Sequence, residues 1–413
     1  MKYDIIIIGG GLSGLTAGIK LAGNNKKVAI ITSGQSALHF SSGSMGLLSA
    51  IDGQPVTEPL KELDRLPEGH PYRKIGLGKI GTLAAEAAQL LDKAGISMWG
   101  NAAKCHYRLT PLGMWEPTWL SNESIAACEH PTKCPWRKAA IVNLKGYLDF
   151  FPEYVADGLR KVGIQSSCHE VTLPELAHLR KSCSEMRAAS IAKLLHGATL
   201  KALADEINRI SGDADVVLFP AVIGLKSSAE VAELGKLVKK PIRYVPVIPM
   251  PVTGVRSELM LRNLFEKLGG TYLLGDSVTH GIMEGSRLKA VETTNLGNTL
   301  LEADNFILCT GSFFSQGLVA KPNEIVEPVF NLDVDQTAER TERYNKNFFG
   351  EQPYMRFGVT TDSDFRVSHK GSTVGNLRAA GAILSGANAL KEGSGAGIAV
   401  LSALEVANRI LNS

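Results

Sequence analysis

Long hydrophobic runs and closely spaced cysteine pairs are both missing from this sequence of 413 residues. The longest apolar run near the N-terminus, residues 5–8, ends at glycines with no small-residue cleavage site, and nowhere do 18 apolar residues follow one another. Neither a secretion signal nor a membrane-spanning helix is therefore expected. The six cysteines form no C-x-x-C pair, which argues against a zinc ribbon or an iron–sulfur cluster and favours a reduced, cytoplasmic protein. The segment Cys128-Glu-His-Pro-Thr-Lys-Cys134 fits no standard spacing of metal ligands, so no metal site is predicted.

A large excess of charge of one sign is also absent. The 44 Lys and Arg residues nearly balance the 41 Asp and Glu residues, which leaves a net charge of +3. Nucleic-acid binding depends on concentrated positive charge that neutralises phosphates, so no nucleic-acid partner is expected. With 44% hydrophobic and 21% charged residues, the chain has the composition of a globular protein with one large core or two adjoining ones.

A glycine motif stands at the start of the chain. Residues 3–8 form a β-branched run without alternation, as expected for a parallel strand buried on both faces. Gly9-Gly10-Gly11-Leu12-Ser13-Gly14 follows at once, fits G-x-G-x-x-G, and leads into a small-and-apolar helical stretch. Such glycines permit a tight turn, close approach of a phosphate, and close packing of the helix on the sheet. This predicts a Rossmann-like α/β domain in which Gly9, Gly11, Leu12, Ser13 and Gly14 bind a flavin or nicotinamide nucleotide; the alternative is a tight turn without a ligand.

The end of the second strand lacks an expected acid. Residues 28–32 complete a βαβ unit, and an Asp or Glu roughly 20 residues past the glycines usually accepts hydrogen bonds from an adenosine ribose. Thr32-Ser33-Gly34 stands there instead. FMN has no adenosine, so the sequence favours FMN over FAD or NAD, unless another part of the fold supplies the acceptor. FAD is the alternative cofactor.

Two later segments also have the composition of a nucleotide site. Residues 305–308 run apolar into Cys309-Thr310-Gly311, and near the C-terminus the glycine-rich stretch 393–397 enters a small-and-apolar helix. A helix start there can hold backbone amides against the pyrimidine edge of a flavin and stabilise the negative charge of the reduced ring. The alternative is an ordinary packed C-terminal helix. The residues predicted to contact the flavin in these segments are Thr310, Gly311, Gly381, Gly395, Gly397 and Ile398.

The middle of the chain has a different pattern. Helical stretches over 81–94 and 184–210 alternate with loops rich in Pro, His and Trp, a strand is expected over 215–221, and the prolines of 243–251 indicate an exit linker. A helix over 254–268 and short strands over 271–278 and 281–294 follow. We therefore predict a discontinuous flavin-binding domain of residues 1–50, 250–325 and 370–413, and a cap or substrate α+β domain of residues 51–249 and 326–369.

Longer blocks identify a family. Gly34-Gln-Ser-Ala-Leu-His39-Phe-Ser-Ser-Gly43-Ser44, Arg108-x-Thr-Pro-Leu-Gly113, Gly311-Ser-Phe-Phe-Ser315 and Phe357-Gly-Val-Thr-Thr-Asp362 closely resemble the B subunit of bacterial anaerobic glycerol-3-phosphate dehydrogenase, and the resemblance runs from end to end. It implies an FMN-containing subunit of a quinone-linked enzyme that oxidises sn-glycerol 3-phosphate to dihydroxyacetone phosphate. It also implies two partners, a larger flavin-bearing A subunit and an iron–sulfur C subunit, through which this chain would associate peripherally with the membrane. Thr32, Ser33, Ser42, Gly43 and Ser44 complete the predicted flavin contacts.

Oxidising a secondary alcohol needs a base, and binding this substrate needs a phosphate clamp. The candidate bases are His39 and His369. His39 has two other interpretations: a covalent flavin anchor, as in the similar succinate dehydrogenase class, or a histidine bound to backbone near the cofactor. Arginines suit bidentate phosphate contacts, and the candidates are Arg187, Arg256, Arg356 and Arg366.

Two other functions stay open at this point. The chain could be an electron-relay and assembly subunit without its own alcohol-oxidising site, because the sequence shows no clear grouping of His and Arg residues. It could also be a free-standing FAD-dependent reductase. Any chain that exchanges electrons with a partner needs an open flavin site. An exposed apolar patch formed partly by the pairs Phe313-Phe314 and Phe348-Phe349 is therefore expected beside that site, the alternative being that both pairs are buried core.

Overall fold

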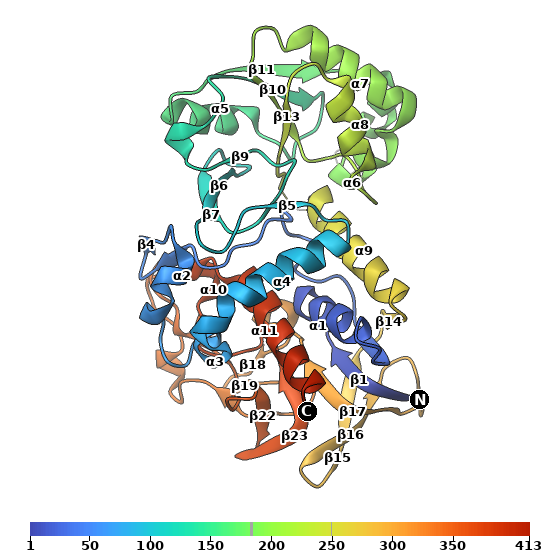
Figure 1. Cartoon of the computed structure of the whole chain (residues 1–413), viewed down its shortest axis with the longest axis vertical. Coiled ribbons are helices and arrows are strands. Elements are labelled where there is room, and N and C mark those ends of the chain that lie inside the picture. The colour runs from blue at the N-terminus through green and yellow to red at the C-terminus, as the bar shows by residue number, and fades with distance from the viewer. Residues whose placement is uncertain (182–184, 249) are drawn as a thin grey trace.

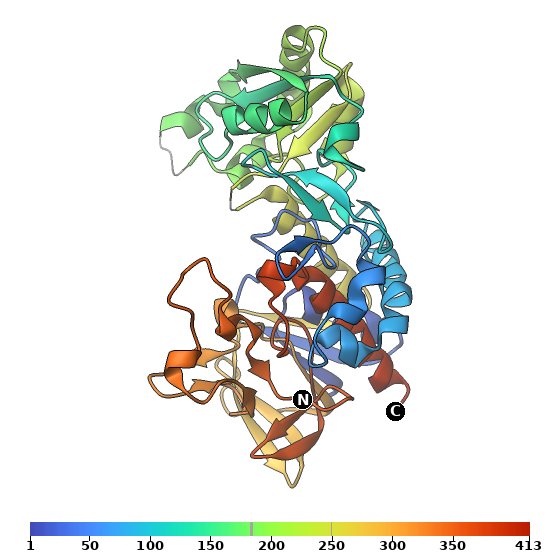
Figure 2. The same cartoon turned by 90° about the vertical axis from the view of Figure 1, so that its left-hand side faces the viewer.

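The computed structural model describes residues 1–181, 185–248 and 250–413. Two lobes are visible in Figure 1 and again after the quarter turn of Figure 2, with both ends of the chain in the lower lobe. Each lobe is built on its own sheet with parallel strands, so the predicted α/β class with a parallel sheet is confirmed. None of the helices in these ranges is both long enough and apolar enough to cross a bilayer.

The lower lobe contains an eight-stranded sheet whose central strands are parallel, in the order β14-β2-β1-β17-β23. Ile5, Ile6 and Ile7 of the first strand are completely or almost completely buried, as the unbroken β-branched run predicts. Three further strands pair antiparallel at the far side, β16 with β17, β15 with β16, and β22 with β23. The strands of this sheet are β1 (Lys2–Ile8), β2 (Val28–Thr32), β14 (Thr271–Leu274), β15 (Val278–Glu284), β16 (Arg287–Thr293), β17 (Leu301–Leu308), β22 (Arg366–His369) and β23 (Ser372–Ala379).

Helix α1 lies between helices from distant parts of the sequence. It packs against both α9 and α11, and α4 packs on α11 (Figure 1). A Cβ at Gly18 would lie 2.8 Å from Ile30 Cδ1 and 2.9 Å from Phe265 Cε2, so this glycine lets α1 approach β2 and α9. The helices of the lobe are α1 (Leu12–Ala22), α2 (Pro59–Glu62), α3 (Pro71–Ile75), α4 (Ile80–Lys93), α9 (Val252–Lys267), α10 (Ala389–Glu392) and α11 (Gly395–Leu411).

The upper lobe is a smaller parallel sheet in the order β11-β10-β12-β13. The connections that join these parallel strands carry helices, as parallel pairing requires. Its elements are β10 (Lys138–Leu144), α5 (Pro152–Lys161), β11 (Gln165–Val171), α6 (Ala188–Leu194), α7 (Gly197–Ile210), β12 (Val216–Pro220), α8 (Ala229–Leu237) and β13 (Ile242–Val245).

Short strand pairs form the remaining sheets. In one of these sheets β6 pairs with both β7 and β9, and Leu109 of β6 is buried in the upper lobe. These strands are β3 (Ala50–Ile51), β4 (Gln54–Pro55), β5 (Met98–Trp99), β6 (His106–Leu109), β7 (Trp115–Thr118), β8 (Ser121–Asn122), β9 (Ala127–Cys128), β18 (Val319–Ala320), β19 (Ile325–Val326), β20 (Val334–Asp335) and β21 (Gly358–Val359).

Two local predictions need correction. The helical stretch over 184–210 is two helices, because α6 ends at Leu194 and α7 begins at Gly197; its first residue, Ser184, lies outside the described residues, as does Cys183. Residues 243–245 of the expected linker belong to β13, which pairs with β12 and buries Tyr244 and Val245. Burial of this apolar segment against the neighbouring strand outweighs the turn tendency of the prolines that follow it.

The buried side chains form two clusters. One combines residues between 3 and 120 with residues between 261 and 410, and the other draws on residues between 109 and 252. Leu83 and Val359, from segments assigned to the cap by sequence, pack in the first cluster. The division into domains stays a proposal, and this packing favours a cap that begins near residue 120 over one that begins at residue 51.

We expect two unfolding transitions, one for each cluster. Leu218 of β12 and Leu404 of α11 are both fully buried, in the upper and lower clusters respectively. Leu218→Ala and Leu404→Ala should each lower the free energy of unfolding of its own transition by about 2–5 kcal/mol through lost burial and a residual cavity. Urea titration followed by circular dichroism measures both. If the wild type and both variants unfold in a single shared transition, the clusters are one cooperative unit.

Candidate functional site

A cavity of about 790 Å³ opens where four neighbouring parallel strands end. Its walls are the loops that follow β1, β2, β14 and β17, together with the start of α11. Ligands of open α/β sheets bind in the crevice outside the carboxyl ends of the strands. The position of the cavity is therefore that of a cofactor site.

Close backbone contacts shape the loop after β1. Gly9 has a φ of 110°, and a Cβ there would lie 2.2 Å from the carbonyl oxygen of Cys309. A Cβ at Gly14 would lie 1.9 Å from the carbonyl oxygen of Gly9. Only glycine fits either position, so the motif lets the loop and the first turn of α1 pack against each other and against the end of β17.

Two helices begin at the cavity without a capping side chain. Gly11 precedes α1 and Ser394 precedes α11, and neither helix has a side-chain cap bond at its N-terminus or an acidic residue in its first turn. Leu12 and Ser13 of α1 and Gly395 and Ala396 of α11 line the cavity. The free amides and the positive dipole ends of both helices can thus act on an anionic or electron-rich ligand.

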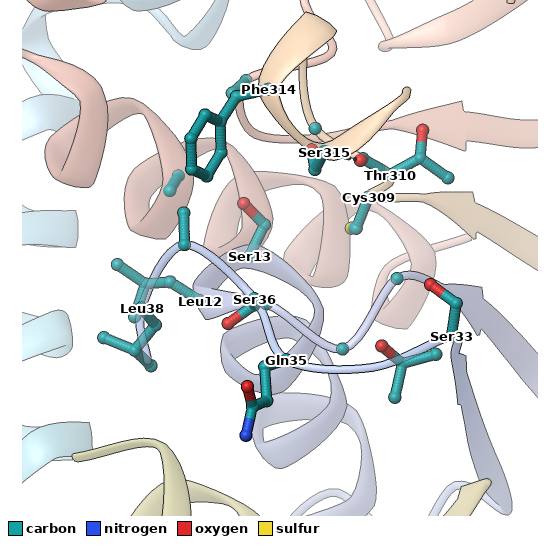
Figure 3. Close-up of a pocket in the computed structure, with 18 of the residues that line it drawn as sticks. Leu12, Ser13, Ser33, Gln35, Ser36, Leu38, Cys309, Thr310, Phe314 and Ser315 are labelled. Atoms are coloured by element: carbon teal, nitrogen blue, oxygen red, sulfur yellow. Dashed lines mark hydrogen bonds between the residues drawn. The ribbon is translucent and has the colours of Figure 1, made fainter. Parts of the chain in front are cut away.

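Two buried hydroxyls at the cavity have no partner within the described residues. Ser44 Oγ and Thr310 Oγ1 both belong to lining residues and make no hydrogen bond there. Figure 3 shows Thr310, Ser13, Leu12 and Phe314 among the side chains around this space. Buried polar groups without partners are costly, so a ligand with polar groups would satisfy these hydroxyls. The residues present fit a nucleotide cofactor.

The charge of the cavity is unusual. Among the lining residues that the structure describes there is no Lys, Arg or His, and Asp276 is the one charged side chain. An anionic ligand would therefore be held by backbone amides and hydroxyls. Within these ranges no three His, Cys, Asp or Glu side chains are grouped so that they could hold a metal ion.

The predicted cofactor contacts divide into two groups. Those that line the cavity are Gly9, Gly11, Leu12, Ser13, Thr32, Ser33, Gly43, Ser44, Thr310, Gly311 and Gly395. Gly14, Ser42, Gly381, Gly397 and Ile398 do not line it. Gly381 instead packs under α1, where a Cβ would lie 2.0 Å from Ser13 Oγ, and a Cβ at Gly397 would lie 2.2 Å from the Tyr72 hydroxyl. These two glycines shape the walls through packing.

His39 lies beside the cavity but does not line it. It is buried, and its Nδ1 lies 2.6 Å from Oε2 of Glu258 on α9. Glu258 also accepts hydrogen bonds from the amide and the hydroxyl of Ser36. One carboxylate thus holds the loop that carries the lining residues Ser36 and Leu38, and the interaction of His39 observed here is with a carboxylate rather than with backbone.

His369 is at the other end of the sheet. It is the last residue of β22 and lies opposite Ser372, at the amino end of β23, whereas the cavity is at the carboxyl ends. The structure does not bring His369 together with the glycine loop.

The candidate arginines are engaged elsewhere. Arg187 pairs with Asp149 in the upper lobe, and Arg366 pairs with Asp362 and Asp364. Arg356 bonds to Glu392 and Glu351. None of these arginines lines the cavity.

Arg256 is the most buried of the candidates. Its guanidinium donates to the carbonyl oxygens of Ile223 and Gly224 at 3.0 and 2.7 Å. Burial lowers the pKa of this group from its ordinary value. Both bonds join α9 to the loop after β12 in the upper lobe, so the structure gives Arg256 a connecting role and places it outside the cavity.

Three of the four phenylalanines in the expected patch are strongly exposed. Phe314 is 78% exposed and lines the cavity, and Phe348 and Phe349 are each 82% exposed. Phe313 is partly buried against Tyr354, with ring centroids 6.1 Å apart. Lys391 of α10 donates to the carbonyl oxygen of Phe349, which ties the second pair to the lower lobe.

Several lining residues were not found from the sequence. Ser36 and Leu38 belong to the block 34–44 but were not singled out, and Asp276 was missed altogether. A polar residue just after a buried strand is a signal for a ligand site in a parallel sheet. Asp276 follows Gly275 after β14, but the sequence does not reveal that β14 lies next to β2.

Comparison with known proteins agrees with the fold and the cavity. The model of the FAD binding domain family matches residues 4–398. The fold and site thus define a flavin-binding α/β protein, which confirms the predicted Rossmann-like flavin-binding fold.

Full-length relatives narrow the class. The chain is 43% identical to the B subunit of anaerobic glycerol-3-phosphate dehydrogenase from Yersinia enterocolitica, over 100% of this chain and 99% of the relative. It is 39% identical to the protein of the same name from Pectobacterium atrosepticum, with the same coverage. The chain belongs to this family, that of the B subunit of anaerobic glycerol-3-phosphate dehydrogenase, as the sequence blocks predicted. Among solved structures, 3-ketosteroid delta1-dehydrogenase from Sterolibacterium denitrificans aligns with 100% of this chain over 99% of its own length, at 9% identity and with a TM-score of 0.46.

We expect Gly11→Val to remove the flavin while the fold persists. Gly11 has a φ of −78° and extended ψ, which valine adopts readily, but a Cβ there would lie 3.3 Å from Ser36 Cβ, so the larger side chain would crowd the lining residue Ser36 in the cavity at the start of α1. Flavin affinity should fall at least about tenfold, with unchanged circular dichroism. Gly235→Val on α8, where a Cβ meets nothing within 4 Å, is the matched control. Full flavin occupancy in the Gly11 variant would remove this loop from the binding site.

Proposed function

We propose that this chain is the flavin-bearing subunit of an anaerobic sn-glycerol-3-phosphate dehydrogenase, which oxidises glycerol 3-phosphate to dihydroxyacetone phosphate. One observation carries the proposal. The family blocks 34–44 and 311–315, far apart in the sequence, both contribute walls to the same cavity. A bound flavin would accept the hydride that leaves the secondary alcohol. Electrons would then pass to the quinone pool through partner subunits.

The chain's own residues supply binding and orientation. The amides at the start of α1 are suited to a phosphate, and those at the start of α11 are suited to the electron-rich edge of the flavin ring. Ser44 and Thr310 offer hydroxyls to its polar atoms. FMN, which the family resemblance implies, and FAD, the alternative, both contain the groups that these residues would bind. They differ by an adenylate, so an acceptor for its ribose distinguishes them.

A second function is favoured by the lining itself. Within the described residues, the cavity has no Lys, Arg or His, so neither a base nor a phosphate clamp stands directly at it. The chain would then relay electrons, and the alcohol would be oxidised on the larger subunit. His39 is the nearest of the predicted bases, since its neighbour Leu38 lines the cavity.

Anaerobic reduction distinguishes the two functions. The purified chain is reconstituted with flavin, and glycerol 3-phosphate is added while flavin absorbance is followed. Bleaching of the chain alone is the expected result for a subunit with its own alcohol-oxidising site. Bleaching only after the larger subunit is added would establish the relay function, and no bleaching with either would contradict the proposed substrate.

The partners in this proposal are a larger flavin-bearing A subunit and an iron–sulfur C subunit, through which the chain would associate peripherally with the membrane from the cytoplasm. Phe314 stands at the cavity and is largely exposed, as are Phe348 and Phe349. Exposed aromatic side chains of this kind are costly in water and are enriched at protein interfaces. We assign the docking of the larger flavin subunit to this surface.

Charged replacements test the docking surface. Phe348→Asp combined with Phe349→Asp, two positions that do not line the cavity, should weaken binding of the larger flavin subunit, by at least about tenfold, because buried aromatic anchors dominate interface energies. The flavin of this chain should stay bound. Co-purification and a binding titration measure the effect, with Leu148→Asp, an exposed residue of the upper lobe, as control. Assembly of the double variant with wild-type affinity would place docking elsewhere.

A further inference from the structure

A buried carboxylate stands directly before one of the helix starts at the cavity. Glu392 is the last residue of α10 and is 6% exposed, and Gly395, three residues further on, begins α11 and lines the cavity. Because consecutive Cα atoms are about 3.8 Å apart, the backbone of Glu392 lies within about 11 Å of that lining residue. A buried charge is screened only weakly by salt, so the charge of this side chain acts on the cavity.

Four donors hold this carboxylate, two of them from distant parts of the chain. Oε1 accepts hydrogen bonds from the amide of Asn388 at 3.0 Å and from Arg356 Nη1 at 3.1 Å. Oε2 accepts from the hydroxyl of Ser394 at 2.9 Å and lies 3.2 Å from Nε2 of His70. Both oxygens are therefore engaged, and the turn between α10 and α11 is fixed by the side chain that it carries.

These contacts keep the side chain ionised. His70 is completely buried, and its Nδ1 accepts a hydrogen bond from the amide of Tyr72, so a neutral ring carries its proton on Nε2, which faces Glu392. Burial by itself would raise the pKa of Glu392, but the hydrogen bonds, above all the one from His70, outweigh burial and hold the pKa below its ordinary value. Glu392 therefore carries a negative charge at neutral pH.

The charge of Glu392 opposes the effect of the α11 amides. The free amides at the start of α11 favour added negative charge in the cavity, whereas a nearby carboxylate disfavours it. In the function proposed above, a flavin that takes up a hydride gains two electrons and one proton, so the reduced ring carries one negative charge more than the oxidised ring. The energy of that added charge depends on both the amides and the carboxylate.

We propose that Glu392 lowers the reduction potential of the flavin bound in the cavity, so that electrons taken up from the substrate leave more readily for the partner subunit. The proposal rests on the flavin-binding function above. Glu392 acts here through its charge and through the helix start that it fixes, so it is a positioning residue and not a catalytic one.

Two variants that break the same ion pair test the proposal. Glu392→Gln removes a negative charge and Arg356→Gln removes a positive one. The chain is purified with its flavin, and the midpoint potential of the flavin is measured by anaerobic titration against reference dyes. We expect the potential to rise in Glu392→Gln, which means that the affinity for reduced relative to oxidised flavin increases about 5- to 10-fold, the effect of one charge at about 11–15 Å with an effective dielectric constant of about 20. The potential should fall in Arg356→Gln, by a smaller amount because the Arg356 side chain is partly exposed.

Charge-conserving variants are the matched controls. Glu392→Asp and Arg356→Lys disturb the same hydrogen bonds but keep both charges, so the midpoint potential should stay at its wild-type value. A purely structural role of the pair would instead move the potential in these two variants as well. Circular dichroism of all four variants establishes that the fold persists.

The outcomes are distinct. Shifts of the same sign in Glu392→Gln and Arg356→Gln, or an unchanged potential in both, would overturn the proposal. If Glu392→Gln does not fold, the two Arg356 variants decide alone, and an unchanged or raised potential in Arg356→Gln would then overturn it. Wild-type protein that binds no flavin at all would instead refute the proposed function, and the role of Glu392 with it.

Discussion

The arrangement of the whole site depends on how closely two stretches of backbone approach each other at the ends of β1 and β17. The turn at Gly9 leaves no room for a side chain beside the carbonyl oxygen of Cys309, and the first turn of α1 at Gly14 leaves none beside Gly9. Because residues 9 and 309 are brought together in this way, the N-terminal motif and the small-residue turn after β17 become two walls of one cavity. The parallel pairing of β1 with β17 sets the distance between them.

The described lining of the cavity contains a single charged side chain, that of Asp276. Negative groups of a ligand would meet the uncapped starts of two helices, and the single carboxylate of the described lining is placed at the side of β2 and β14. Dipoles and amides that are fixed in the fold need little reorganisation when a ligand binds.

The sequence predicted what depends on neighbouring residues and missed what depends on strand order. The strand before Gly9, the helix after Gly14 and the glycine-rich start of α11 follow from local patterns, because each pattern contains its own structural reason. Asp276 could not be placed at the cavity, since its position there requires β14 to lie beside β2, and that pairing is made between segments about 240 residues apart. The candidate arginines show the same limit: the residue type suits a phosphate, but Arg256 and Arg187 each have a partner, distant in the sequence, that only the fold reveals.

Helix α9 joins the two lobes through side chains only two positions apart. Arg256 is bound to the loop after β12 in the upper lobe, and Glu258 is bound to Ser36 and His39 beside the cavity of the lower lobe. Because a helix is stiff over such a short span, the two attachments cannot move independently. The position of the loop after β12 is therefore tied, through α9, to the position of the loop that carries Ser36 and Leu38 in the wall of the cavity.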